Sequence, residues 1–200
     1  MVLYKLSGAI VNLYLNARYF VDIEGLENIP KTGAGIVVSN HRATNDIFLL
    51  GGFVPRHLHF IAKEELFTGE GLRGKIASLY MNDMRAIPVN RNGNESGVLK
   101  KCLSYLNKGE LLAIFPEGTR YQDEHVHSFK PLASLLAQKK NVPIIPLGIH
   151  GSEQKRLWTD ISMVVGEALW PQEGESREEL TYRSELAVSE LSGYKAPRKD

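Results

Sequence analysis

Short apolar runs alternate with helical segments along this chain. Runs such as GIVVS at 35–39 and LLAIF at 111–115 are apolar throughout, which is typical of strands buried in a sheet. The expected strands cover 19–23, 35–39, 57–61, 85–89, 111–115, 144–149 and 161–165, and the expected helices cover 3–17, 46–53, 72–80, 95–106, 130–139 and 177–191. This alternation predicts an α/β fold, a single domain with a mostly buried mixed sheet flanked by helices.

The composition is consistent with this fold and limits the classes of molecule that the protein is expected to bind. Two hundred residues are enough for one domain with a sizeable core, and 43% of them are hydrophobic. The formal net charge of +1 argues against a dedicated nucleic-acid-binding protein, because such proteins usually carry a basic excess. The single cysteine, Cys102, lies in an apolar-periodic stretch, so we expect a small core residue in a reducing compartment.

The first twenty residues are apolar but interrupted by polar side chains, so they predict neither a transmembrane helix nor a signal peptide. As a helix, this segment places one apolar stripe on a single face, formed by Leu3, Leu6, Ile10, Leu13, Ala17 and Phe20. Tyr4, Val11 and Leu15 form a second apolar side. Two apolar sides require two apolar neighbours, and two alternatives stay open: burial in the core or a dimer interface, and a position between the core and a lipid surface.

The stretch VSNHRATND places His41 just after an expected strand and Asp46 in the first turn of an expected helix. Across such a turn the two side chains can meet, and the aspartate then fixes the imidazole tautomer and leaves the other ring nitrogen free to take a proton. The sequence has no G-x-S-x-G nucleophile motif. The hydroxyl to be activated is therefore expected to belong to a substrate, and the alternative is a capped turn with a solvated histidine.

A second polar turn follows the strand at 111–115. Its residues, PEGTR, project Glu117, Thr119 and Arg120 from the carboxyl end of that strand. The segment RAIPVNR at 85–91 also ends a short strand with an arginine, Arg91. Converging arginines beside a histidine–aspartate pair indicate a substrate that carries phosphate, whereas each arginine alone is better explained by a surface ion pair.

These motifs occur in the order N-H-x4-D, I-P-V-N-R, F-P-E-G-T-R and V-P-I-I-P. In this order they resemble the four sequence blocks of the glycerolipid acyltransferases, and the resemblance extends over about residues 20–170. It implies a glycerol-3-phosphate acyltransferase-like fold. It also implies that His41 is the general base and that Asp46 holds it. Residues implied in acceptor binding are Asn40, Arg91, Glu117, Gly118, Thr119, Arg120 and Lys130.

The same resemblance implies an activity. A fatty acyl group passes from a thioester of coenzyme A or acyl carrier protein to the free hydroxyl of 1-acyl-sn-glycerol-3-phosphate, giving phosphatidic acid, with no bound metal or cofactor. The alternatives are another lysolipid or glycolipid acceptor, or a non-catalytic lipid-binding protein of the same fold. Both substrates are amphiphiles, so residues 1–20 are expected to associate peripherally with the cytoplasmic face of the cell membrane, and residues 21–200 to form the acyltransferase domain.

Two positions depart from the family pattern near the predicted site. Ala43 stands where the family often has serine, and Arg85 replaces the usual glycine before the second block. We expect Arg85 to place a second positive charge near Arg91 and so to influence the choice of acceptor.

Overall fold

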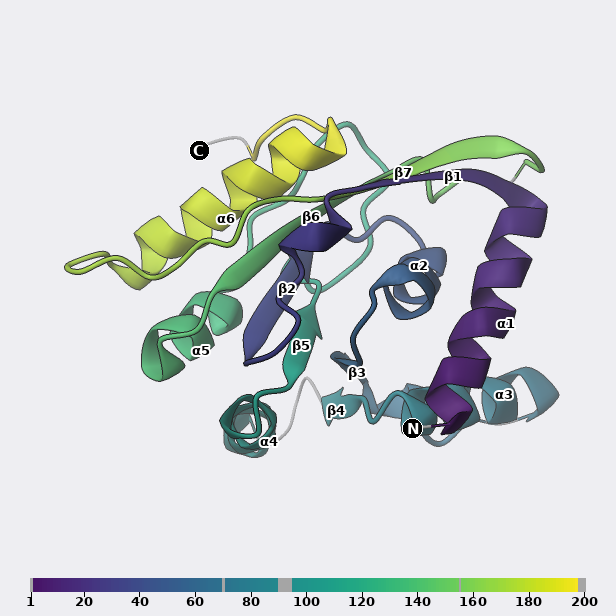
Figure 1. The fold of residues 1–200 in the computed structure, drawn as a ribbon, viewed down its shortest axis with the longest axis horizontal. Coiled ribbons are helices and arrows are strands. Elements are labelled where there is room, and N and C mark those ends of the chain that lie inside the picture. Colours follow the sequence, from purple (N-terminus) through teal and green to yellow (C-terminus); the bar gives the residue numbers. More distant parts are fainter. Residues whose placement is uncertain (1, 70, 90–94, 155, 198–200) are drawn as a thin grey trace.

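The computed structural model describes residues 2–69, 71–89, 95–154 and 156–197. It has three layers, a central sheet with helices packed on both of its faces (Figure 1). The helices α1, α2 and α3 lie on one side of the sheet, and α4, α5 and α6 lie on the other.

The sheet has seven strands in the order β1-β7-β6-β2-β5-β3-β4. All neighbouring pairs are parallel except β6 and β7, which are antiparallel, so the predicted mixed sheet is confirmed. The strands are β1 (Tyr19–Glu24), β2 (Gly35–Ser39), β3 (Leu58–Lys63), β4 (Ile87–Val89), β5 (Leu111–Ile114), β6 (Ile144–His150) and β7 (Thr159–Val165). The strands β2 to β6 all run in one direction and leave their carboxyl ends at one edge of the sheet, where ligands usually bind in such folds.

Six α-helices connect or flank these strands within the described residues. They are α1 (Val2–Arg18), α2 (Asn45–Phe53), α3 (Gly71–Asp83), α4 (Glu95–Asn107), α5 (Leu132–Lys140) and α6 (Arg177–Ser192). The helix α6 begins with a complete capping box, in which the side chains of Ser176 and Glu179 accept each other's backbone N–H groups.

Each face of the sheet carries its own apolar core. Along β2 the side chains alternate, so Val37 packs with the core under α1 and α2, whereas Ile36 and Val38 pack with the core under α4, α5 and α6. All five residues of β2 are buried. Cys102 is a fully buried member of the second core, and burial raises the pKa of its thiol to about 12, which confirms the expected inert core residue.

The N-terminal helix α1 packs against α2 through Val11 and Leu15. Gly52 of α2 allows this close approach, because a Cβ there would lie 3.1 Å from Val11 Cγ1. In the part of the predicted apolar stripe whose side chains the structure describes, Ile10, Leu13 and Phe20 are all exposed, and Leu13 is 73% exposed. The side chains of Leu3 and Leu6 lie outside that part. No helix among the described residues combines the length and apolar character needed to cross a bilayer.

Candidate active site

The two polar turns of the sequence meet at the carboxyl edge of the sheet. They follow β2 and β5, which are parallel neighbours with Val38 paired to Ile114. The loop after β2, residues 40–44, which we call the histidine loop, therefore lies beside the turn at 115–121. We call this turn the acceptor turn, after its predicted role.

His41 and Asp46 are in contact across the turn, as their spacing predicts. His41 Nδ1 lies 2.8 Å from Asp46 Oδ2, and the same oxygen accepts the backbone N–H groups of Arg42 at 2.7 Å and Ala43 at 2.8 Å. A carboxylate oxygen only accepts, so Nδ1 carries the proton of the neutral imidazole. Asp46 is fully buried in the first turn of α2, where the helix dipole favours its negative charge.

The imidazole of His41 is held flat against Phe115. The two rings are stacked with centroids 4.2 Å apart and an interplanar angle of 17°. No described residue forms a hydrogen bond with Nε2, and the side chain is 16% exposed. The ring therefore has a fixed orientation and one free basic nitrogen that faces away from Asp46.

Three hydrogen bonds join the acceptor turn to the histidine loop. The His41 N–H donates to Glu117 Oε1 at 3.3 Å, and the Tyr121 N–H donates to the carbonyl oxygen of His41 at 3.1 Å. Arg120 Nη1 donates to Thr44 Oγ1 at 2.8 Å. The acceptor turn thus holds the histidine loop in place as well as presenting its own side chains.

Glu117 is an unusual carboxyl in this setting. It is only 6% exposed, and among the described residues its Oε2 has no hydrogen-bond partner. Burial raises the pKa of Glu117 to about 8, although the His41 N–H and the charge of Arg42 both act in the opposite direction. The carboxyl is therefore mostly protonated near neutral pH.

Gly118 and Lys130 form the outer part of the acceptor turn. Gly118 has a positive φ of 77°, and a Cβ there would lie 3.0 Å from Lys130 Nζ, so the ammonium group rests over the glycine. The Lys130 N–H donates to Pro116 O at 2.9 Å, which fixes this lysine beside the turn. Thr119 and Arg120 are exposed at the same turn.

Most of the predicted site residues come together, with different surroundings. The side-chain amide of Asn40 is hydrogen-bonded to the backbone of the neighbouring strand. Its Nδ2 donates to Ile149 O at 2.8 Å, and its Oδ1 accepts the Ile149 N–H at 2.9 Å. This amide joins the end of β2 to β6, and a role in substrate binding stays a prediction. Arg91 lies outside the described residues, so its role stays a prediction too.

The structure does not place Arg85 at the predicted site. Arg85 is exposed and comes before β4, at the amino-terminal end of the strand, whereas the site lies at the carboxyl ends. Its carbonyl oxygen contacts His59 and Tyr105 there. The carboxyl end of β4, and not the end where Arg85 lies, is at the edge of the sheet that carries the site, so Arg85 lies away from the site. The expected proximity of Arg85 to Arg91 stays a prediction, because Arg91 lies outside the described residues.

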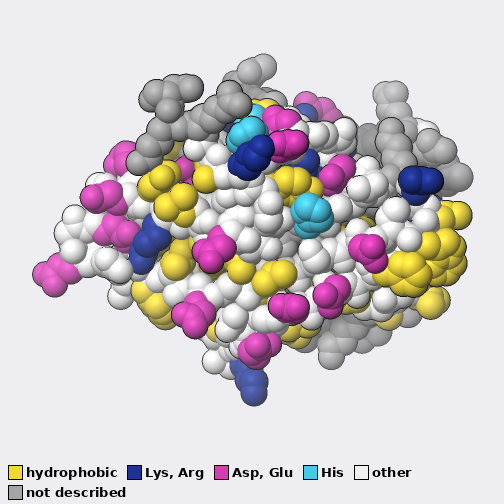
Figure 2. Space-filling view, turned by 90° about the horizontal axis from the view of Figure 1, so that it is seen from above, with side chains coloured by type: hydrophobic (Ala, Val, Ile, Leu, Met, Phe, Trp, Pro, Cys, Tyr) yellow, Lys and Arg dark blue, Asp and Glu magenta, His cyan; other side chains and the backbone are white. Residues whose placement is uncertain are grey.

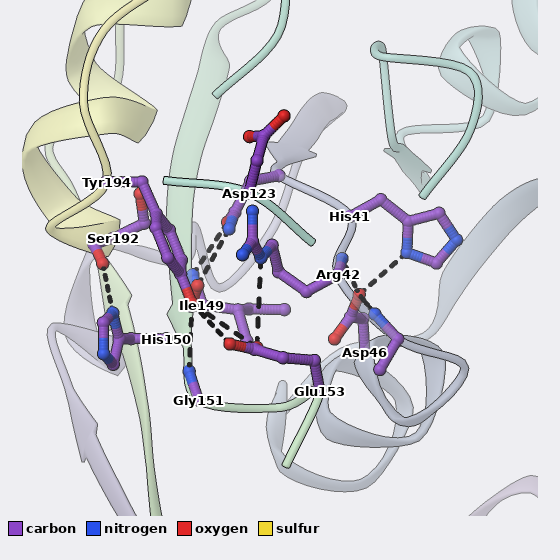
Figure 3. A network of polar contacts seen from close by, with 12 residues as sticks. His41, Arg42, Asp46, Asp123, Ile149, His150, Gly151, Glu153, Ser192 and Tyr194 are labelled. Carbon is purple, nitrogen blue, oxygen red and sulfur yellow. Dashed lines mark hydrogen bonds and ion pairs between the residues drawn. The ribbon is translucent and has the colours of Figure 1, made fainter. Parts of the chain in front are cut away.

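Sequence reasoning missed the residues behind the histidine loop. Figure 3 shows Arg42 pointing away from His41 toward Glu153 and Tyr194. Arg42 Nε lies 3.9 Å from Glu153 Oε2, and the guanidinium carbon lies 3.9 Å from the centroid of the Tyr194 ring. Because these three residues come from distant parts of the chain, no motif signals the cluster.

The fold and the site define a class of protein: a three-layer α/β protein with a histidine–aspartate pair at the carboxyl edge of its sheet. The sequence model described as "Acyltransferase" matches residues 20–150. The chain belongs to the acyltransferase family.

Individual relatives agree with this assignment. The chain is 28% identical over 171 residues to the 1-acyl-sn-glycerol-3-phosphate acyltransferase of Bacillus subtilis (strain 168), with 84% of this chain and 82% of that protein covered. It is 35% identical over 137 residues to the chloroplastic 1-acyl-sn-glycerol-3-phosphate acyltransferase LPAT1 of Arabidopsis thaliana. That match covers 67% of this chain and 37% of the plant protein, so the chain spans little more than a third of its length.

A solved structure confirms the expected fold. The crystal structure of the 1-acyl-sn-glycerophosphate (LPA) acyltransferase PlsC from Thermotoga maritima superposes with a TM-score of 0.75 at 31% sequence identity. The superposition covers 96% of this chain and 78% of that chain.

Proposed function

We propose that this chain transfers a fatty acyl group from a thioester of coenzyme A or acyl carrier protein to the free hydroxyl of 1-acyl-sn-glycerol-3-phosphate, which gives phosphatidic acid. The observation that carries the proposal is the His41 ring, bound to Asp46 through Nδ1, stacked on Phe115 and free at Nε2. The matching relatives named as 1-acyl-sn-glycerol-3-phosphate acyltransferases support the choice of acceptor.

In the proposed reaction, Nε2 of His41 takes the proton of the acceptor hydroxyl. The oxygen then attacks the thioester carbonyl carbon, the C–S bond breaks, and the proton passes to the leaving thiolate. Asp46 stabilises the imidazolium that forms in between, and general-base catalysis of this kind contributes about 10²–10⁴-fold to the rate. A thioester is already reactive, so the proposal includes no metal or bound cofactor.

Charge in the acceptor turn favours a phosphate-bearing acceptor. Arg120 uses one nitrogen on Thr44 and is otherwise exposed, and Lys130 is exposed over Gly118. Because Glu117 is mostly neutral near pH 7, it does not cancel these two positive charges. We therefore infer that Arg120 and Lys130 bind the phosphate of the acceptor, and that Arg91 joins them.

A bilayer surface is part of the same proposal, because both substrates are amphiphiles. Exposed apolar side chains gather where α1 joins β1 and where β7 begins: Ile10, Leu13, Phe20, Leu157 and Trp158. Figure 2 shows hydrophobic side chains concentrated at that end of the molecule. The rings of Phe20 and Trp158 are paired with centroids 5.7 Å apart.

Strand direction supports this surface as the one that meets lipid. The strand β7 runs antiparallel to β6, and β1 runs parallel to β7, so both begin at the edge where β2 ends in the histidine loop. Trp158 has a strained backbone, with a positive φ of 61°, and its N–H donates to Arg18 O at 2.8 Å. We infer peripheral binding that presents the site to the membrane, on the cytoplasmic face where the thioester donors are found.

One experiment tests the function directly. The purified chain is incubated with vesicles that contain a mixed pool of lysolipids, in the presence of several acyl-CoA and acyl carrier protein thioesters, and the products are identified by mass spectrometry. Phosphatidic acid that forms with wild type and disappears with His41→Ala supports the proposal. A different acylated lysolipid as the main product supports the alternative acceptor.

Two further outcomes would contradict the proposal. Free fatty acid without an acylated acceptor would indicate a thioester hydrolase. Lipid binding by wild type and His41→Ala alike, with no acyl transfer by either, would indicate a non-catalytic lipid-binding protein.

A further inference from the structure

Arg42 has an unusual position for an arginine. It follows the proposed base directly in sequence, yet its side chain is only 3% exposed and leaves the loop on the side opposite to His41 (Figure 3). Among the described residues its Nε and Nη1 have no hydrogen-bond partner. A buried guanidinium with two unsatisfied nitrogens is costly, so its other contacts must hold it.

Those contacts come from the C-terminal end of the fold. The guanidinium lies over the ring of Tyr194 at 3.9 Å, a distance at which a cation and an aromatic face attract each other. Glu153 lies nearby, 3.9 Å from Arg42 Nε, and its carboxylate accepts the Tyr194 hydroxyl at 3.1 Å. The ring and the carboxylate thus enclose the charge from two sides.

Tyr194 is itself fixed by the surrounding elements. Ser189 of α6 donates its hydroxyl to Tyr194 O at 2.6 Å, and the ring is stacked on His150 at the end of β6, with centroids 4.8 Å apart. The next residue, Lys195, is bonded to the chain that follows the acceptor turn. Its N–H donates to Glu124 O, and its carbonyl oxygen accepts the Val126 N–H, both at 2.9 Å.

The backbone of Arg42 connects this cluster to the proposed catalytic pair. Its N–H donates to Asp46 Oδ2 at 2.7 Å, and the same oxygen holds Nδ1 of His41. A shift of Arg42 would therefore displace the aspartate oxygen that orients the imidazole. Glu153 and Tyr194 contact the side chain of Arg42.

We propose that Arg42 and Tyr194 are positioning residues for acyl transfer. The C-terminal segment 193–195 holds the guanidinium of Arg42, and so keeps the loop at 40–44 in the conformation in which Asp46 Oδ2 accepts three N–H groups. The kinetic part of this inference rests on the proposed function. The structural part concerns the orientation of His41 alone.

The kinetic test compares Arg42→Met, Tyr194→Leu and Tyr194→Phe in the full chain. Arg42→Met and Tyr194→Leu are expected to lower kcat by about 10²-fold, with KM changed by less than about threefold, because a misplaced base affects the transition state more than substrate binding. Tyr194→Phe keeps the ring under the guanidinium and is expected to retain kcat within about threefold.

Arg183→Met is the matched control. Arg183 is part-buried, pairs with Glu175 at 3.0 Å and lies on α6, away from the site. It is expected to lose thermal stability without a loss of kcat. If Arg42→Met and Tyr194→Leu lower Tm to the same extent as Arg183→Met and retain wild-type kcat, the two residues are merely structural and the inference is overturned.

A spectroscopic measurement separates this inference from the proposed function. The Nδ1–H proton of His41 in its bond to Asp46 gives a downfield proton NMR signal, assigned by its loss in Asp46→Asn. The inference predicts that the signal disappears in Tyr194→Leu and persists in Tyr194→Phe and Arg183→Met, whether or not the protein transfers acyl groups. A signal that persists in Tyr194→Leu would overturn the inference, whereas absent acyl transfer by wild type would overturn only the proposed function.

Discussion

Asp46 accepts three N–H groups on one carboxylate oxygen. His41, Arg42 and Ala43 all bond Oδ2, whereas among the described residues Oδ1 has no partner. The same oxygen therefore shapes the loop and orients the base. These two tasks can be separated, because the backbone N–H groups need only an acceptor and the imidazolium needs a negative charge.

Asp46→Asn tests this separation. The asparagine oxygen can still accept the two backbone N–H groups, so we expect Tm to stay within about 3 °C of wild type, a change of less than about 1 kcal/mol. The charge is lost, so kcat is expected to fall by about 10²–10⁴-fold. Steady-state kinetics and thermal unfolding measure the two quantities, and Asp22→Asn on the exposed face of β1 serves as the control.

Glu117 makes stability depend on pH in a direction opposite to that of most carboxylates. Burial raises the pKa of this carboxyl to about 8 in the folded protein, against an ordinary value of 4.5. Between these two pH values the folded state binds a proton that the unfolded state has released. The free energy of unfolding contributed by this group therefore falls as pH rises from about 4.5 to about 8.

Glu117→Gln is expected to remove this decrease. Urea denaturation of both proteins, at intervals between about pH 5 and pH 8.5, measures the difference in unfolding free energy. The unfolding free energy of the variant should rise relative to that of wild type as pH rises, by an amount on the order of a few kcal/mol across the range. Parallel pH profiles of the two proteins would show that Glu117 is ionised in the folded state.

At the scale of elements, the acceptor turn depends on one left-handed glycine. Gly118 needs its positive φ, and its missing side chain leaves room for Lys130. Gly174 has the same φ of 77° but nothing within 4 Å of its Cβ position, so it shares only the first of these two requirements. Substitutions at these two glycines therefore distinguish the effect of backbone strain from the effect of contact with Lys130.

Gly118→Ala and Gly174→Ala are therefore expected to behave differently. Both should lose about 1–2 kcal/mol of stability, since each forces an alanine into the left-handed region. Only Gly118→Ala should also raise KM for the lysolipid acceptor, because the new methyl group displaces the Lys130 ammonium. An equal change of KM in both variants would contradict a specific role for Lys130.

The sequence predicts most elements because local patterns determine them. The strand at 35–39 and the capping box at Ser176 occur as expected, and a turn after a strand was enough to predict the contact between His41 and Asp46. The burial of a single side chain and the contacts between distant segments leave no such pattern in the sequence. The raised pKa of Glu117 and the contact between Arg42 and Tyr194 both depend on which segments pack together, which periodicity does not encode.

At the scale of the whole molecule, one apolar stripe remains uncovered. The sequence predicted the stripe along α1 but left its neighbour open, and the structure turns Val11 and Leu15 inward and Ile10 and Leu13 outward. The outward residues continue to Trp158, at the edge that carries the histidine loop. This arrangement supports the proposed peripheral contact with a bilayer.

Leu13→Glu tests the contact. The charge is expected to weaken binding to phospholipid vesicles by at least about tenfold, because burying it in the interface costs more than 1.4 kcal/mol. Leu186→Glu is the control, since Leu186 is exposed on α6, across the sheet from α1. Vesicle co-sedimentation measures binding, and equal binding by wild type and Leu13→Glu would place the lipid contact elsewhere.

The pairing of β1 with β7 also has a consequence for biosynthesis. Tyr19 is aligned with Thr159, so the first strand finds its partner only when most of the chain has left the ribosome. Until then β1 is in the nascent chain without the strand with which it pairs, and its apolar side chains are open to water, to chaperones or to lipid. Translation close to a membrane would shorten the time during which this apolar segment can aggregate with other chains.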